Sequence, residues 1–177
     1  MAIKLSLEAA LHGTLAPDEI RASQALADVS FVDFEGQEQS GQIVVHRDLV
    51  DEVACIFGDL RAAGFPLHSV VPVSEFGWSD DASMAANNCS GFNYRLAVGR
   101  ATLSQHALGR AVDINPVQNP YVRGDLILPP RGRYDERELG TILAIGPVVA
   151  AFESRGWTWG GRWTSLKDWH HFEKPSS

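Results

Sequence analysis

Two short segments far apart in the sequence constrain this chain most, because each carries both histidine and aspartate. In the segment 104–113, His106 and Asp113 are seven residues apart, with Gly109 between them. Much further along, Asp168-Trp-His-His171 offers further imidazoles and another acid. Two histidines and one aspartate fill three zinc positions and leave the fourth open for water, as in catalytic rather than structural zinc sites. The fold must therefore bring the two segments together, and the pattern indicates metal-assisted hydrolysis.

Asp113 stands inside an apolar segment, between Val112 and Ile114. A carboxylate at such a place is costly unless it is paired or binds a metal. Gly109 permits a turn that brings His106 back toward Asp113. The alternative interpretation is a hydrogen-bonded structural histidine followed by an aspartate that caps a turn.

His170 and His171 are neighbours, so on a strand they face opposite sides and only one of them can readily join the metal. The same alternation separates Asp168 from His171. If both of these serve one site, the backbone must bulge or turn between them. Periodicity alone does not choose between the two histidines.

Length and composition indicate one globular domain with a sizeable core, since the chain has 177 residues, of which 45% are hydrophobic and 21% charged. The net charge of −7 argues against nucleic acid and against an anionic membrane surface as partners. No apolar run approaches the roughly 20 residues that a membrane span needs. Glu8 and His12 interrupt the N-terminal segment, so we expect any secretion signal to be absent or already removed. The sequence does not indicate an oligomeric state.

Cys55 and Cys89 are too few for a thiolate cage, so nitrogen and oxygen atoms should hold any metal. They can form one disulfide or remain as two buried thiols.

Apolar periodicity predicts an α+β fold, in which helices and strands are segregated along the chain. The helix over 49–63 has an apolar face of Val50, Val53, Ile56, Phe57 and Leu60, with Asp48 as its N-cap and Gly64 at its end. The remaining expected helices cover 17–28 and 136–154, the latter with a kink at Gly146-Pro147. Expected extended segments cover 29–34, 41–46, 67–73, 92–96, 111–114, 157–159 and 168–172. The stretches 78–88 and 115–134 are expected to be loops.

The sequence resembles the zinc D-Ala-D-Ala carboxypeptidases and L-Ala-D-Glu endopeptidases of bacterial cell walls. Their pattern S-x-H-x-x-G-x-A-x-D matches from Ser104 to Asp113 without a gap, and the pattern acid-x-x-His-Phe matches from Asp168 to Phe172. The resemblance covers about residues 29–173. It implies a small antiparallel sheet flanked by helices, similar to the zinc domain of hedgehog, in a single domain over 1–177 that carries residues 1–28 as an N-terminal extension.

The resemblance also implies roles for individual residues. Zn²⁺ would be bound by His106, Asp113 and His171, with Asp168 as general base and Arg95 as a substrate or oxyanion contact. Two extra residues, Asn93 and Tyr94, precede Arg95 where many relatives have a compact Ser-Gly-Tyr-Arg, and the base is Asp where the related vancomycin-resistance dipeptidases have Glu.

Two further residues have less definite roles. His170 is either a donor to the oxyanion or a packed neighbour of the ligand. Ser104 is expected to hydrogen-bond near a metal ligand rather than act as a nucleophile, because no Gly-x-Ser-x-Gly elbow surrounds it.

The function that the resemblance implies is hydrolysis of peptidoglycan stem peptides at the bacterial cell wall, in the periplasm or outside the cell. The motifs do not choose between a carboxypeptidase and an endopeptidase. Two alternatives stay open: a non-enzymatic zinc module that binds a cell-wall peptide or a protein partner, and an intracellular dipeptidase or amidase. An acid at position 168 favours an enzyme, since a binding module needs no general base.

Overall fold

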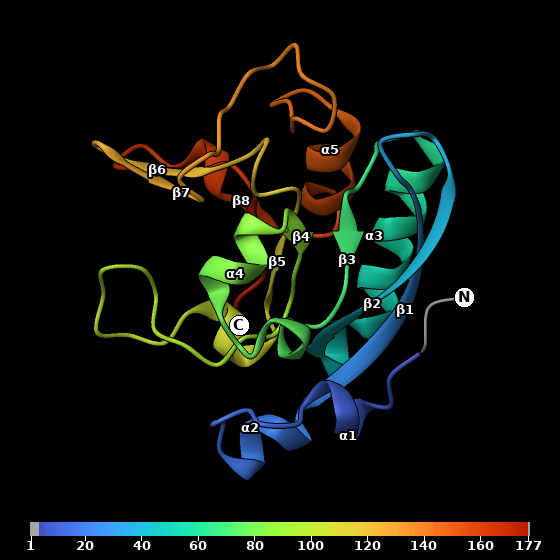
Figure 1. Cartoon of the computed structure of the whole chain (residues 1–177), viewed down its shortest axis with the longest axis vertical. Helices are drawn as coiled ribbons and strands as arrows, with labels where there is room; N and C mark the ends of the chain where they lie inside the picture. Colours follow the sequence, from blue (N-terminus) through green and yellow to red (C-terminus); the bar gives the residue numbers. More distant parts are fainter. Residues whose placement is uncertain (1–3, 177) are drawn as a thin grey trace.

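The computed structural model describes residues 4–176, in which short helices surround several small sheets (Figure 1). This mixed architecture is compatible with the expected α+β class. The α-helices are α1 (Leu7–Ala10), α2 (Asp18–Ala22), α3 (Val50–Ala62), α4 (Asp80–Ala85) and α5 (Pro147–Glu153). Single turns of 3-10 helix are η1 (Arg47–Leu49), η2 (Val73–Phe76), η3 (Gln105–Leu108) and η4 (Gly160–Arg162). No helix among the described residues is long and apolar enough to cross a bilayer.

The strands form four small sheets within the described part of the chain, where one sheet was expected. The long hairpin of β1 (Gln24–Val32) and β2 (Glu38–His46) forms a two-stranded sheet of its own. A second sheet has the order β5-β10-β8, a third has the order β7-β6-β9, and a short parallel pair joins β3 to β4. Their bounds are β3 (Ser69–Val70), β4 (Asn88–Cys89), β5 (Ala111–Asp113), β6 (Tyr121–Arg123), β7 (Leu126–Leu128), β8 (Thr158–Trp159), β9 (Lys167–Asp168) and β10 (His171–Glu173).

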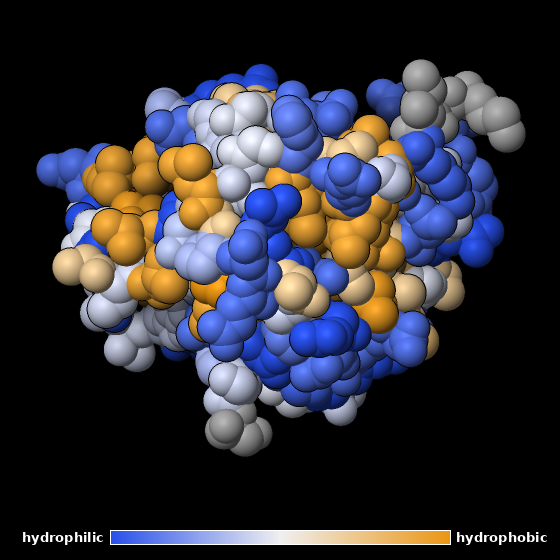
Figure 2. Space-filling view, turned by 90° about the horizontal axis from the view of Figure 1, so that it is seen from below, coloured by the Kyte–Doolittle hydropathy of each residue, from blue (hydrophilic) through white to orange (hydrophobic). Residues whose placement is uncertain are grey.

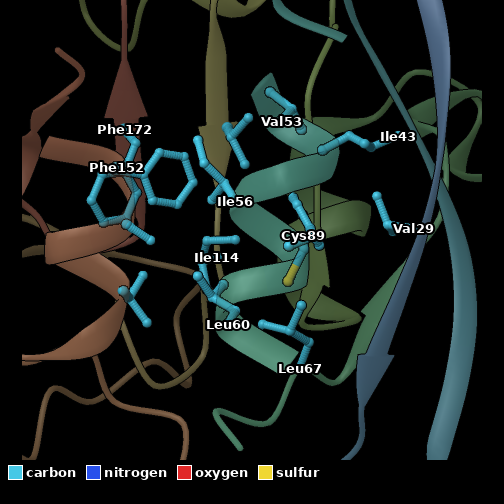
Figure 3. Close-up of a cluster of buried hydrophobic side chains, with 14 of the residues drawn as sticks. Val29, Ile43, Val53, Ile56, Leu60, Leu67, Cys89, Ile114, Phe152 and Phe172 are labelled. Carbon is cyan, nitrogen blue, oxygen red and sulfur yellow. The ribbon is translucent and has the colours of Figure 1, made fainter. Parts of the chain in front are cut away.

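The main core lies on both sides of α3, which separates the β1–β2 hairpin from the C-terminal elements (Figure 3). The predicted apolar face of α3 is confirmed, because Val53, Ile56, Phe57 and Leu60 are all fully buried. Val50, the fifth residue of that face, is partly buried against the same core. On the C-terminal side, Phe152 of α5 stacks on Phe172 of β10 with ring centroids 3.9 Å apart. Burial of these side chains supplies most of the drive for folding. It also fixes β10, whose first residue is His171.

A second, smaller cluster joins α1 and α2 to the rest of the molecule. It contains Ala10, Leu11, Ala16, Val44 and Phe92. The indole Nε1 of Trp78 donates a hydrogen bond of 2.9 Å to the carbonyl of His12, and its ring meets Phe92 edge-on. From the side on which α1 and α2 lie, the surface shows apolar patches among hydrophilic residues (Figure 2). Residues 5–22 therefore pack on β2 and on the segments that carry Trp78 and Phe92.

Replacing Trp78 with Phe should lower the free energy of unfolding by about 1–2 kcal/mol, because it removes the hydrogen bond to the carbonyl of His12 and part of a packed ring. Denaturant unfolding measures this loss. An unchanged midpoint would show that the N-terminal segment does not stabilise the domain.

The expected helix over 17–28 is wrong beyond Ala22, because β1 begins at Gln24. Along β1, Ala27, Val29 and Phe31 are buried at every second position, so the packing of the hairpin overrides helix propensity. The strands expected over 29–34 and 41–46 are parts of β1 and β2, which are longer.

The expected helix over 136–154 is wrong in its first half, since α5 begins only at Pro147. Proline disfavours a helical conformation in the residue before it but suits the first helical position. Gly146 is accordingly extended and serves as the N-cap. The pair Gly146-Pro147 starts this helix rather than kinking it.

Smaller corrections concern helix ends and loops. Asp48 is not the N-cap of α3 but lies in η1, where its backbone N–H donates to His46. The expected loop 78–88 contains α4, capped by the Ser79 hydroxyl, and the expected loop 115–134 contains the β6–β7 hairpin. Of the extended segments expected over 67–73 and 92–96, the first holds only β3 and the second only a single bridge from Leu96 to Leu103. Both cysteines are free thiols; Cys89 is buried and Cys55 exposed.

Candidate metal centre

Three separate elements bring His106, Asp113 and His171 together: η3, β5 and β10. His171 lies directly opposite Asp113 in the antiparallel pairing of β10 with β5. Gly109 ends η3 with φ +68°, and a Cβ there would clash with the side chain of Gln24 and the backbone of His46. The predicted turn at Gly109 is therefore confirmed, and the close approach to β2 requires glycine.

The candidate ligand atoms form a compact triangle. Nε2 of His106 lies 3.0 Å from Oδ1 of Asp113 and 3.2 Å from Nδ1 of His171, and this Nδ1 lies 3.1 Å from the same Oδ1. All three side chains are buried. In a tetrahedral zinc site with bonds of about 2.0–2.1 Å, neighbouring ligand atoms are about 3.3 Å apart. The three residues thus fit a zinc ion with little adjustment.

Ionic contacts and hydrogen bonds within this cluster shift the pKa values of Asp113 and His171. Burial alone would raise the pKa of Asp113, but the charges of His106 and His170 outweigh it and hold that pKa well below the usual range. Burial would lower the pKa of His171, yet its hydrogen bonds to Asp113 and Glu173 raise it to about 10. Because a ligand histidine must be neutral, metal uptake has to displace protons, and its apparent affinity should fall as the pH falls.

Two groups that were not predicted orient the imidazoles. Nδ1 of His106 donates to the carbonyl of Gly91 at 2.6 Å, which turns Nε2 toward the cluster. On His171 the orientation is reversed: Nε2 lies 3.0 Å from Oε2 of Glu173, which leaves Nδ1 to face Asp113. Partners of this kind fix the tautomer and the ring orientation of metal-binding histidines.

Replacing Glu173 with Gln should weaken metal binding by about 10- to 100-fold, the usual cost of losing a carboxylate behind a ligating histidine. Competition with a chromophoric chelator measures this affinity. An affinity equal to that of the unmodified protein would show that Glu173 does not set the orientation of His171.

The extended segment expected over 168–172 is wrong in its middle, because the backbone turns between Asp168 and His171, as the alternation argument required if both serve one site. Asp168 belongs to β9, which pairs with β6, and residues 169 and 170 form a turn before β10 begins at His171. His170 is buried, and its Nε2 lies 2.9 Å from Oδ1 of Asp168 and 3.7 Å from Oδ2 of Asp113. Its Nδ1 donates to the carbonyl of Asn119. Burial lowers the pKa of His170, but Asp168 and Asp113 raise it to about 9, so a cation links the two acids.

The metal cluster lies in the wall of a cleft of about 620 Å³. Arg95 lines the same cleft, and its Nε lies 3.0 Å from Oδ1 of Asp80. The buried Ser104 also lines the cleft, and its hydroxyl accepts a hydrogen bond from the backbone N–H of His106. Ser104 therefore shapes the turn that carries a ligand. All seven predicted site residues meet at this cleft, which is lined by Arg95, Ser104, His106, Asp113, Asp168, His170 and His171.

A buried His-Asp-His cluster that opens on a cleft, with a further carboxylate beside it, is the arrangement of a mononuclear metallohydrolase. A family comparison gives the particular family. The model of the D-alanyl-D-alanine carboxypeptidase family matches residues 87–174, which include all the site residues named above. Through these residues the chain belongs to that family. No curated protein and no solved structure was found to match the chain.

Proposed function

We propose that this protein is a zinc metallopeptidase that hydrolyses peptide bonds in the stem peptides of bacterial peptidoglycan. The observation that carries the proposal is the buried triangle of His106, Asp113 and His171, which meets Asp168 in one cleft. The family to which the chain belongs supports the substrate. The same reasoning favours action in the periplasm or outside the cell.

The chain itself provides a suitable set of zinc ligands, namely two imidazole nitrogens and one carboxylate oxygen. When bound there, zinc would supply a Lewis acid that makes water a nucleophile near neutral pH. This set contains no sulfur ligand. The Sγ of Cys89 accepts a hydrogen bond from the backbone N–H of Asn115 and does not contact the cluster. The carboxylate of Asp113 offsets part of the charge of a divalent cation in a buried place.

Asp168 is the proposed general base. Its carboxylate lies beside the ligand cluster, linked to Asp113 through the ring of His170. It would take a proton from the attacking water onto a carboxylate oxygen and pass that proton to the nitrogen of the leaving amine. The contact with His170 holds the Asp168 side chain in place for both transfers.

Arg95 is the proposed cationic contact for the substrate carbonyl or carboxylate. Its guanidinium lies in the cleft and is fixed by Asp80 and by a hydrogen bond to the carbonyl of Leu96. Such fixing favours binding and catalysis, because the side chain loses less freedom when substrate arrives. A role in oxyanion stabilisation would lower kcat when Arg95 is removed, whereas carboxylate binding would mainly raise KM.

We propose a hedgehog/DD-peptidase-like fold for the family-like core over residues 29–173. Residues 1–28 precede this core as an N-terminal extension of one zinc peptidase domain over 1–177. The contacts of α1 and α2 with Phe92 and Val44 support treating the described part of this extension as an integral part of the domain.

Mass spectrometry tests this function. Zinc-loaded protein is incubated with purified peptidoglycan and with a stem pentapeptide that ends in D-Ala-D-Ala. We expect a peptide shortened by D-alanine, or new amino termini inside the stem peptide; the product identifies the bond cleaved. If neither substrate changes while zinc is bound, the protein is a zinc module that binds a peptide or a protein partner without cleaving it.

A further inference from the structure

Most arginine side chains of this acidic protein are already engaged. In the described part of the chain they either form an ion pair with a carboxylate or donate to a backbone carbonyl. The exceptions among residues 4–176 are Arg47, Arg100 and Arg123. Two of these three, Arg100 and Arg123, lie at one place.

Arg100 lies at the tip of the loop between β4 and β5, and the guanidinium of Arg123 approaches this tip. This tip is a tight turn in which the Ala97 amide donates to the carbonyl of Thr102 at 2.9 Å. Gly99, next to Arg100, has φ +68°, and a Cβ built on it would lie 2.7 Å from Nη1 and 2.8 Å from Nη2 of Arg123. The guanidinium of Arg123 therefore packs directly on the backbone beside Arg100.

Because Arg100 and Thr102 line the cleft that holds the metal cluster and are exposed, this loop tip lies at the outer edge, or mouth, of the cleft. Val98, Arg100 and Thr102 line the cleft from the loop, and Tyr121 and Leu128 line it from the β6–β7 hairpin. The loop and the hairpin project on the same side of the molecule (Figure 1). Since Arg123 belongs to β6, its contact with Gly99 joins the two walls.

The cleft is therefore polarised. Its inner part holds Asp113, Asp168 and Glu173 around the histidines, whereas Arg100 lines its mouth. The guanidinium of Arg123 packs on the adjacent Gly99, and neither arginine has a carboxylate partner among the described residues. Holding two cations together without a counter-ion costs free energy, which an anion recovers. A guanidinium fork matches a carboxylate in geometry and charge.

We propose that Arg100 and Arg123 form a carboxylate-binding subsite, so that the cleft takes an anionic peptide with one carboxylate at its mouth and its scissile bond at the metal cluster. The proposal rests on the proposed function for the position of the scissile bond, but not for the binding itself. The carboxylate comes either from the C-terminus of the peptide or from an acidic residue within it.

The test is isothermal titration calorimetry with zinc-loaded Asp168→Asn protein, which prevents turnover during the titration. Three forms of a stem pentapeptide are compared: the free acid, the C-terminal amide, and the form with its internal acidic residue amidated. We expect Arg100→Gln and Arg123→Gln each to weaken binding of the free acid about fivefold at low salt. One of the two amidated peptides should bind weakly to the parent protein and lose nothing further in these variants; that peptide identifies which carboxylate is bound.

Two variants control for structure and net charge. Arg47→Gln removes an exposed, unpaired arginine away from the cleft and should leave binding unchanged. Gly99→Ala keeps both charges but displaces the guanidinium of Arg123, so it should weaken binding of the free acid in the same direction as Arg123→Gln. The subsite is refuted if both amidated peptides bind as tightly as the free acid, or if the arginine variants weaken all three peptides equally.

These outcomes are separable from those of the proposed function. If the unmodified protein cleaves the pentapeptide but binds the free acid and the amides equally, the proposed peptidase function is supported and the carboxylate-binding subsite is refuted. If the unmodified protein distinguishes the free acid from an amide through Arg100 and Arg123 but cleaves none of the peptides, the subsite is supported and the peptidase function is refuted.

Discussion

Zinc-loaded Asp168→Asn protein should keep its metal and lose about 100-fold or more in kcat, the usual scale for removal of a general base. Asparagine preserves the size of the side chain but accepts no proton from water. Asp168 is outside the ligand triangle, being 2.9 Å from Nε2 of His170, so its replacement leaves all three metal contacts in place. Steady-state kinetics at matched zinc occupancy measure the effect.

Asp59→Asn is the matched control for that substitution. Asp59 of α3 pairs with Arg155, and neither residue lines the cleft, so the same chemical change there should leave kcat unaltered. Unchanged turnover in zinc-loaded Asp168→Asn protein would contradict the role of Asp168 as a base. Loss of zinc from this variant would instead make Asp168 a ligand.

His171→Ala and His106→Ala proteins should lose stoichiometric zinc and, with it, turnover. Each substitution removes one corner of the triangle of Nε2, Oδ1 and Nδ1, and two remaining ligands do not hold zinc firmly. His170→Ala is the comparison that the sequence itself offers, because His170 is adjacent but its ring nitrogens contact Asp168 and the carbonyl of Asn119. It approaches Asp113 only at Oδ2, which is outside the triangle. We expect the His170→Ala protein to retain zinc.

Elemental analysis of the three purified variants distinguishes the two neighbouring histidines. Zinc retained by His171→Ala but lost from His170→Ala would transfer the ligand role to His170. Circular dichroism shows whether each variant is folded, so that loss of metal is not mistaken for unfolding.

The sequence predicted which residues form the site better than it predicted how the strands bring them together. A carboxylate at Asp113 within an apolar strand and a glycine between it and His106 could be interpreted from the residues alone, and both are found in the places expected. The choice of His171 over His170 came only from the resemblance. Alternation could not supply it, because the turn at residues 169 and 170 arises from the pairing of β9 with β6 and of β10 with β5.

The groups that orient the ligands were missed for different reasons. Glu173 is two residues after His171 on the same strand, so the period of two in a strand was a usable signal. The carbonyl of Gly91 left no signal, because a backbone acceptor is available at every residue.

The helix α4 was missed for a different reason. It depends on the Ser79 cap and on burial of Met84, and its six residues are too few for periodicity to reveal.

A zinc titration of the metal-free protein tests the central claim most directly. The protein is stripped with a chelator, and cleavage of the D-Ala-D-Ala pentapeptide and of peptidoglycan is measured as zinc is added in known amounts. The account predicts no cleavage at zero zinc, followed by a rise that stops at one zinc per chain and is absent in His106→Ala protein. Cleavage that survives complete removal of metal, or that does not depend on His106, would contradict it.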